Sequence, residues 1–403
     1  MFYGWRVVAG MFVCQMFSVG FFTYSASILT SPVRESFGAS LEEVMYSLTI
    51  GTLAGLIVMP VTGFLIDKYS VRHMVGVGLL LFASGLWAIA NSTSIGVYVV
   101  CFGITMSVAM SLVGSLAASA VISRWFSKSR GRALGVSAAG TSVGGILVPI
   151  MLTWAIELWG WRAALEYLAL FLVLVVLPFV FATVRGRPED VGMTIEESAS
   201  PVAGAHVDAP LTLPQIIKAP AFWVLGISLG LLFSAYSAVL ANLNPYITHG
   251  GFSAQQASSA IMLLAATGLI GKLGFGFLAD KINLRVGLWL AQGLALAACV
   301  IIALEPAYFG IMFAAILLGL AAGGMLPVWG ALMAQIFGVS SYGRAMGMMS
   351  PIITLCVMPG YAVTGMIFDS TGSFSVAWWL CSGLIVAAML LLAGLKAKAI
   401  GAD

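Results

Sequence analysis

The sequence predicts an all-α membrane protein with twelve transmembrane helices, arranged as two parallel six-helix repeats. Of its 403 residues, 61% are hydrophobic and 8% are charged, whereas about 25% are charged in soluble domains. The apolar residues form runs close to the ~20 residues that cross a bilayer. Two sequence elements also recur in the second half of the chain. This composition excludes a pair of soluble domains, a disulfide-built scaffold and a disordered chain.

Apolar runs separated by charges and turn residues predict six helices in each half. In the first half we expect helices at 6–30, 41–65, 74–91, 96–122, 133–157 and 162–183. In the second half we expect them at 219–247, 254–279, 286–304, 307–333, 342–368 and 374–395. The first run has no small-residue cleavage site, so it is typical of a membrane helix rather than a signal peptide.

The segment 184–218 differs from both halves, because it combines charged residues with Pro, Ala and Ser. Such a composition is typical of a solvated linker. We therefore expect an N-terminal bundle at 1–183, a cytoplasmic linker at 184–218 and a C-terminal bundle at 219–403. The five cysteines all fall inside apolar runs, without a CxxC pair, and we interpret them as small hydrophobic residues.

The positions of lysine and arginine predict that both termini lie in the cytoplasm. With this orientation, fifteen of the eighteen cations fall in cytoplasmic segments. The outer loops hold only Arg34 and Arg162, and Lys272 remains inside a helix. An excess of this size follows the positive-inside rule. We expect a multi-pass protein of the plasma membrane, in bacteria the inner membrane.

Two elements recur along the chain at nearly one offset. Gly63-Phe64-Leu65-Ile66-Asp67-Lys68 matches Gly276-Phe277-Leu278-Ala279-Asp280-Lys281, which lies 213 residues later. Gly131-Arg132-Ala133-Leu134-Gly135 matches Gly343-Arg344-Ala345-Met346-Gly347 at an offset of 212 residues. Because six helices separate the copies, both repeats cross the membrane in the same direction. Two parallel repeats are an architecture of secondary transporters, whose substrate site lies between the repeats near the midplane.

The G-x-L-x-D-K element and its echo resemble the loop motif of the major facilitator superfamily, and the resemblance covers the whole chain. Finer features are similar to the bacterial monocarboxylate-transporter and oxalate/formate-antiporter branches. These features are Tyr3-Gly4-Trp5-Arg6-Val7-Val8, Arg124-Trp125-Phe126, Arg130-Gly131, Arg187-Pro188-Glu189-Asp190-Val191-Gly192 and Phe222-Trp223-Val224-Leu225.

The resemblance implies a gating role for Asp67 and Asp280, with Arg132 and Arg344 as their partners. In this superfamily such contacts hold the cytoplasmic side closed while the site faces outward. A carboxylate at the end of a helix can pair with a cation, or face the N-terminus of a neighbouring helix. The alternative is that these charges only set the topology near the lipid headgroups.

Lys272 is the main candidate for substrate binding. It precedes Asp280 by eight residues, about 12 Å of helix, which is close to the middle of a ~30 Å hydrocarbon core. A lysine at this depth costs about 2.5–3.5 kcal/mol. Its neighbours three and four positions away are Gly268, Leu269, Phe275 and Gly276. A bound anion is the simplest way to offset this cost; the alternatives are a wet cavity, or a lysine neutralised by burial.

The resemblance also bears on the substrate class. In the two branches named above, arginine usually stands where Lys272 stands, and lysine keeps the charge without the bidentate fork. Oxalate/formate antiporters carry a second cation in helix 11, where this chain has Ser350-Pro351-Ile352-Ile353-Thr354. One cation best neutralises one anion, which favours a monocarboxylate such as lactate, pyruvate or formate. Animal monocarboxylate transporters have a proton-coupling aspartate where Gly268 stands.

Several polar residues within the spans could orient a carboxylate. We expect such a role for Tyr24, Ser115, Ser119, Tyr236, Asn242 and Thr354. Tyr24 matches a helix 1 tyrosine that lines the site in the oxalate branch. Each of these side chains could instead pack or hydrogen-bond between helices, as Ser and Asn do in membranes.

These observations predict a secondary transporter of small organic monocarboxylates that works by alternating access and is coupled to protons. Exchange of anions, as in the oxalate/formate type, and proton-driven efflux of hydrophobic compounds are the alternatives. Efflux is suggested by 20 Met and 23 Phe, although such antiporters usually use a buried carboxylate. We expect a monomer in the lipid bilayer with no cofactor, no metal, no nucleic-acid partner and no enzymatic activity. A transporter-like sensor also remains open.

Overall fold

The computed structural model describes residues 2–195 and 210–395, except for the side chains of 23–27, 31, 41, 42, 254, 258, 361 and 362. The described residues are almost entirely helical and contain no strand. Eleven helical segments are long and apolar enough to cross a membrane. One of them, Arg130–Thr183, is 54 residues long and turns at Gly160, whose φ of 79° interrupts the helix. Glycine adopts this φ without the steric cost that a side chain would bring.

Two compact units make up the chain. Unit 1 comprises Met1–Lys128, Val136–His206 and Ser341–Met348. Unit 2 comprises Ser129–Gly135, Val207–Ser340 and Met349–Asp403. Each unit therefore includes a short segment from the opposite half of the sequence.

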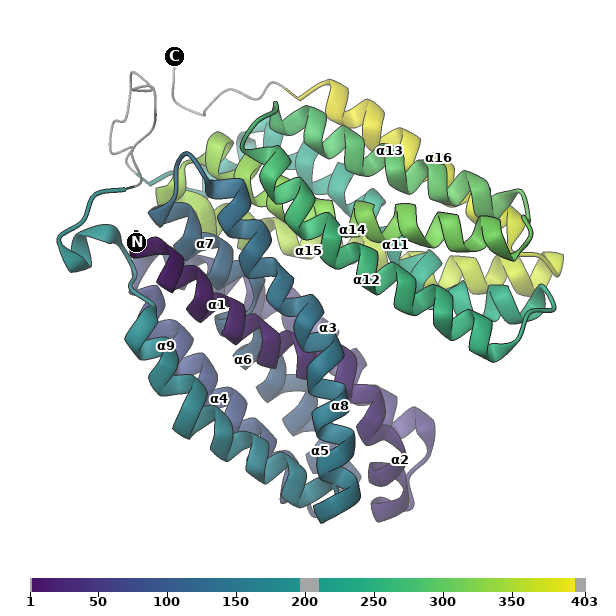
Figure 1. Cartoon of the computed structure of the whole chain (residues 1–403), viewed down its shortest axis with the longest axis horizontal. Coiled ribbons are helices and arrows are strands. Elements are labelled where there is room, and N and C mark those ends of the chain that lie inside the picture. The colour runs from purple at the N-terminus through teal and green to yellow at the C-terminus, as the bar shows by residue number, and fades with distance from the viewer. Residues whose placement is uncertain (1, 196–209, 396–403) are drawn as a thin grey trace. The chain divides into compact units, whose positions relative to one another are not determined.

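The helices of the first half are coloured purple to teal in Figure 1. They are α1 (Gly4–Val19), α2 (Ala26–Phe37), α3 (Leu41–Lys68), α4 (Val71–Ala90), α5 (Ile95–Val100), α6 (Met106–Val113), α7 (Ser115–Trp125), α8 (Arg130–Phe171) and α9 (Leu177–Thr183). Three π-helical segments connect some of them: η1 (Gly20–Ser25), η2 (Cys101–Thr105) and η3 (Leu172–Val176). A 3₁₀ turn, η4 (Pro188–Val191), follows α9.

The helices of the second half run from teal to yellow in Figure 1. They are α10 (Leu213–Lys218), α11 (Pro220–His249), α12 (Ala254–Ala279), α13 (Leu284–Ala303), α14 (Tyr308–Phe337), α15 (Tyr342–Thr371) and α16 (Ser375–Ala393), with the 3₁₀ turn η5 (Val339–Ser341) before α15. Within unit 2, α12 packs most extensively on α14, and α13 packs on both α14 and α16.

The predicted helices match these elements, with three differences. The first run does not end at 30, because α2 continues through Pro32 to Phe37, where Gly38 takes a φ of 62°. The fourth run is divided at Gly114, whose extended backbone separates α6 from α7. The predicted linker contains α10, which begins where Thr212 and Gln215 form a capping box.

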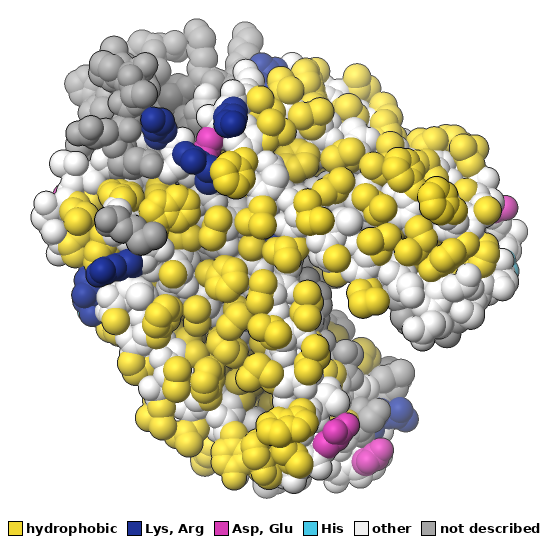
Figure 2. Space-filling view, viewed as in Figure 1, with side chains coloured by type: hydrophobic (Ala, Val, Ile, Leu, Met, Phe, Trp, Pro, Cys, Tyr) yellow, Lys and Arg dark blue, Asp and Glu magenta, His cyan; other side chains and the backbone are white. Residues whose placement is uncertain are grey.

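The packing of each unit fits a membrane environment. Helices approach closely through glycine, as where a Cβ at Gly20 would lie 2.8 Å from the backbone of Gly144; such contacts strengthen association in lipid. Large apolar side chains remain on the outside, with Ile57 73% exposed and Phe309 85% exposed. Figure 2 shows hydrophobic side chains over most of the visible face of unit 1, and most of that unit's visible Lys and Arg side chains near one end.

Candidate functional site

Asp67 lies at the end of α3 and receives hydrogen bonds from the start of α15, within unit 1. The amides of Gly343 and Arg344 donate to its two carboxylate oxygens at 2.9 and 2.8 Å. The Arg344 Nε and Arg124 Nη2 atoms lie 3.7 and 3.9 Å from the carboxylate. The Asp67 side chain is 1% exposed. Because the first N–H groups of a helix lack intrahelical partners and carry partial positive charge, they suit a carboxylate.

Asp280, immediately after α12, receives the equivalent contacts within unit 2. The amides of Gly131 and Arg132 donate to it at 2.6 and 3.1 Å, and the Arg132 Nε donates at 2.9 Å. We call these two arrangements, with their donors, the Asp67 latch and the Asp280 latch. Facing a helix N-terminus was one arrangement expected for these aspartates, although the donating amides and Arg124 beside Asp67 were not singled out from the sequence. The G-R-A-x-G element signals those amides, because its first two residues supply them in both copies.

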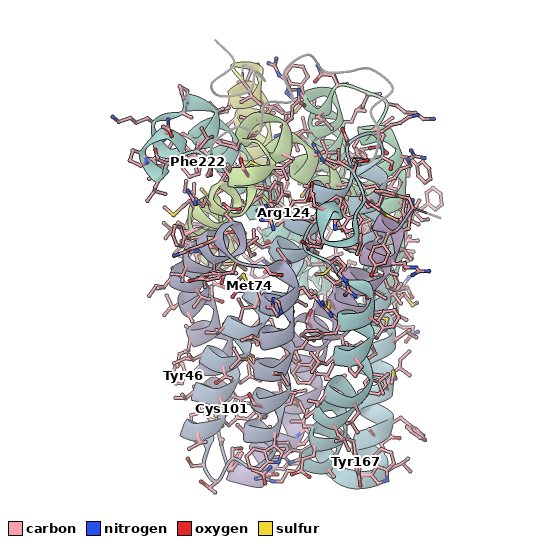
Figure 3. The ribbon with its side chains drawn as sticks, turned by 90° about the vertical axis from the view of Figure 1, so that its left-hand side faces the viewer. Tyr46, Met74, Cys101, Arg124, Tyr167 and Phe222 are labelled. Atoms are coloured by element: carbon pink, nitrogen blue, oxygen red, sulfur yellow. The ribbon has the colours of Figure 1, made fainter. Side chains whose placement is uncertain are left out.

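Arg124 also fixes the end of α3 through a second contact. Its Nη2 atom donates to the carbonyl of Ile66 at 2.8 Å. Figure 3 places Arg124 near one end of the unit 1 helices, with Tyr167 near the opposite end. The Asp67 latch and its arginines therefore lie at one end of this unit.

Lys272 lies in the last third of α12 and is half-buried. It follows the first residue of α12 by 18 positions and precedes the last by seven, about 27 and 10 Å along the helix. It is thus deep in an apolar span, although nearer to the end that carries Asp280. A Cβ at Gly323 of α14 would lie 2.6 Å from the backbone nitrogen of Lys272, and one at Gly135 would collide with the Lys272 carbonyl. Glycines therefore hold the backbone of Lys272 from two sides.

The other predicted site residues of unit 2 are bonded or packed within that unit. The Asn242 amide donates to the carbonyl of Ala238 at 2.9 Å, one turn earlier in α11. The Thr354 hydroxyl donates to the carbonyl of Ser350 at 3.0 Å in α15. Tyr236 is half-buried and packs against the core of unit 2. In the structure these side chains bond to their own helix or pack on the core of unit 2. Their role in binding a ligand stays a prediction.

In unit 1 the structure groups Ser115 with a residue that the sequence prediction missed. The Gln15 amide of α1 donates to the carbonyl and hydroxyl of Ser137 at 2.9 and 2.7 Å. It accepts a hydrogen bond from the Ser115 hydroxyl at 3.1 Å. Gln15 is 1% exposed. The sequence could have drawn attention to it, because it is the one side-chain amide inside the first apolar run. Ser119 is buried nearby in α7, and the side chain of Tyr24 lies outside the described residues.

Comparison with known proteins identifies the family. The profile described as Major Facilitator Superfamily matches residues 11–310 and 251–399. The chain belongs to the major facilitator superfamily. As a member of this superfamily, it is a multi-pass membrane transporter and not an enzyme.

Relatives in the major facilitator superfamily include both efflux proteins and monocarboxylate transporters. The chain is 26% identical over 385 residues to the Fujikurins efflux protein of Gibberella fujikuroi, covering 94% of this chain and 79% of that protein. It is 24% identical over 402 residues to Monocarboxylate transporter 11 of Mus musculus, covering 98% of this chain and 87% of that protein. The structure of the proton:xylose symporter XylE has the same fold, with a TM-score of 0.73, 15% identity and coverage of 99% and 98%.

Proposed function

We propose that this protein is a secondary transporter of small organic monoanions, with Lys272 binding the carboxylate. The depth of Lys272 in α12 carries the proposal. Ionisable residues inside membrane spans are rare, and by default they indicate a substrate or ion pathway. A single cation neutralises a single negative charge, which favours lactate, pyruvate or formate over a dicarboxylate. Similarity over nearly the whole chain to a monocarboxylate transporter supports the same substrate class.

We further propose that the Asp67 and Asp280 latches form and break during alternating access. Each latch joins a carboxylate to the first turn of a helix from the opposite repeat. Such contacts are strong when made and vanish when the helix ends separate. The excess of Lys and Arg at this end of the spans supports a cytoplasmic location, with both termini inside.

Efflux of hydrophobic compounds is the second candidate function. It is favoured by similarity to the Fujikurins efflux protein. Exchange of one anion against another is a third arrangement that uses the same lysine. The three candidates differ in their response to an anion on the opposite side of the membrane and to a proton gradient.

Uptake into proteoliposomes tests the proposal. We expect labelled lactate, pyruvate or formate to enter, and an inward proton gradient to accelerate entry into otherwise empty vesicles. Lys272→Gln should reduce uptake by at least about tenfold, because a charge–charge contact in the span is lost. Lys272→Arg should retain activity, because the cation remains.

The controls separate the candidates. Acceleration by internal anion alone indicates exchange, and movement of a hydrophobic dye without anion uptake indicates efflux. Gel filtration and thermal unfolding of the Lys272→Gln protein show whether it is folded. Wild-type uptake of every anion by folded Lys272→Gln would refute the role of Lys272.

A further inference from the structure

A cavity of about 540 Å³ opens at the end of unit 2 that is remote from Asp280. It is lined by the last turn of α11, the α13–α14 loop and the α15–α16 loop. We propose that this cavity binds a small organic cation of the substituted ammonium class. The volume lies within the range of small-molecule sites. The cavity lies near the first residue of α12, and Lys272 lies about 27 Å further along that helix. The inference is therefore independent of the proposed anion site.

Three aromatic side chains contribute to the cavity wall: Tyr246, Phe252 and Phe374. The Tyr246 hydroxyl donates to the carbonyl of Ile302 at 2.9 Å, which fixes the orientation of its ring. Phe374 is 5% exposed and stacks on both Phe368 and Trp378, so its faces are covered and it serves as packed wall. Phe252 is half-buried and is the ring of the three with the most exposed surface. Fixed aromatic rings attract cations through their negatively polarised faces, and aromatic cages recognise quaternary ammonium groups in this way. In this wall the ring of Phe252 is the one with surface left for a cation, and the packed rings of Tyr246 and Phe374 hold the shape of the cavity.

Glu305 adds a carboxylate to the same wall. The Ser373 hydroxyl donates a hydrogen bond to Glu305 Oε1 at 2.9 Å. Glu305 has a φ of 50°, in a region that residues other than glycine seldom adopt. It also precedes Pro306, which further restricts its backbone. Strained residues of this kind concentrate at ligand-binding sites.

The charges around the cavity favour a cation over an anion. Among the lining residues in the described part of the chain, none is Lys or Arg. The lining includes a histidine, His249, whose ring packs edge-on against Phe368 with 5.0 Å between ring centroids. Asp369 lies nearby on α15, outside the lining. A carboxylate beside aromatic rings, without a neighbouring lysine or arginine, suits an ammonium group.

Calorimetric titration of the purified full-length protein tests the site. The probe is choline, and its control is 3,3-dimethylbutan-1-ol, which has the same shape without the charge. We expect choline to bind in the millimolar range and the alcohol to bind about tenfold more weakly. Glu305→Gln keeps an acceptor for Ser373 but loses the charge, and should weaken choline binding about tenfold. Asp369→Asn is the matched control and should bind choline like the wild type.

A second variant keeps the inference testable if Glu305→Gln does not fold. Ala307 is exposed and lines the same cavity, so Ala307→Lys places a cation in the wall and should abolish choline binding. The inference is overturned if the wild type does not bind choline at about 10 mM. It is also overturned if the alcohol binds as well as choline, or if folded Glu305→Gln or Ala307→Lys binds choline like the wild type.

Discussion

Lys272 and Met59 occupy equivalent places in the two repeats. They are 213 residues apart, the same offset that relates Asp67 to Asp280. A Cβ at Gly347 would lie 2.7 Å from the Met59 carbonyl, just as one at Gly135 would meet the Lys272 carbonyl. The backbone frame is therefore duplicated, whereas the cation is present in one copy only. This asymmetry supports a specific role for Lys272, because packing of the frame is satisfied by methionine.

Gln15 provides a test of a buried polar contact within unit 1. Its amide makes three hydrogen bonds with Ser137 and Ser115. Gln15→Leu keeps most of the volume but removes these bonds, and should cost roughly 1–2 kcal/mol of stability. A lower thermal unfolding midpoint of the purified protein would show the loss. Ser84→Ala, which removes a hydroxyl bonded within its own exposed helix turn, is the control; equal midpoints would contradict the prediction.

Lys272 was singled out because a charge is conspicuous inside an apolar run. The two latch aspartates were singled out because each ends a repeated element that resembles the superfamily's loop motif. The sequence did not single out Gln15, because one amide in a span has no pattern to identify its partners. Nor could it show that the side chains of Asn242 and Thr354 donate hydrogen bonds to backbone carbonyls one turn earlier in their own helices. Side-chain direction depends on rotamer and neighbouring helices, and a linear pattern contains neither.

At the scale of the element, α12 depends on close contact with α14. Gly323→Ala would push a methyl group against the backbone nitrogen of Lys272, 2.6 Å away, and Gly135→Ala would press on the Lys272 carbonyl. Overpacking of this kind costs about 1–3 kcal/mol or moves the helix. We expect each variant to reduce anion uptake several-fold, measured as initial rates in proteoliposomes. Gly274→Ala is the control, since its Cβ would meet nothing within 4 Å, and a loss as large in this variant would argue against the mechanism.

The Asp280 latch allows the backbone contacts to be separated from the ion pair. Asp280→Asn loses the charge and can no longer accept from both helix amides with equivalent oxygens, so transport should slow about tenfold. Arg132→Ala removes a side chain that is 37% exposed, and exposed ion pairs contribute only about 0–1 kcal/mol. We therefore expect at most about a twofold decrease. Initial uptake rates at equal reconstituted protein compare the two, and a larger loss in Arg132→Ala would assign the latch to the ion pair.

Helix boundaries were predicted well where a charge or a turn ends an apolar run. The eighth predicted helix, 254–279, coincides with α12 because Ser253 caps it and Asp280 follows it. The first run was predicted to end at 30, whereas α2 continues through Pro32 to Phe37. Proline is tolerated in membrane helices when other groups satisfy the freed carbonyl. The π-helical segments had no sequence signal, since they depend on packing against neighbouring helices.

At the scale of the whole molecule, the repeat predicted more than any single motif. The two latches use corresponding residues, with Gly131 and Arg132 at Asp280 and Gly343 and Arg344 at Asp67. Duplication therefore predicts that the two latches use equivalent residues, while the structure shows which helix start faces which aspartate. Duplication could not indicate the residues that break the symmetry, among them Glu305 and its cavity, because loops at the helix ends are not repeated.

The predicted direction of insertion, with both termini in the cytoplasm, rests on the distribution of cations and can be tested on intact cells. We expect Thr93→Cys, in the exposed α4–α5 loop, and Leu304→Cys, between α13 and α14, to react with a membrane-impermeant maleimide. Lys128→Cys and Lys281→Cys should react only after permeabilisation, because they lie at the cation-rich ends. The wild type, whose five cysteines are free thiols, gives the background. The reverse pattern would show inverted insertion, and opposite results for Thr93→Cys and Leu304→Cys would show that the repeats are not parallel.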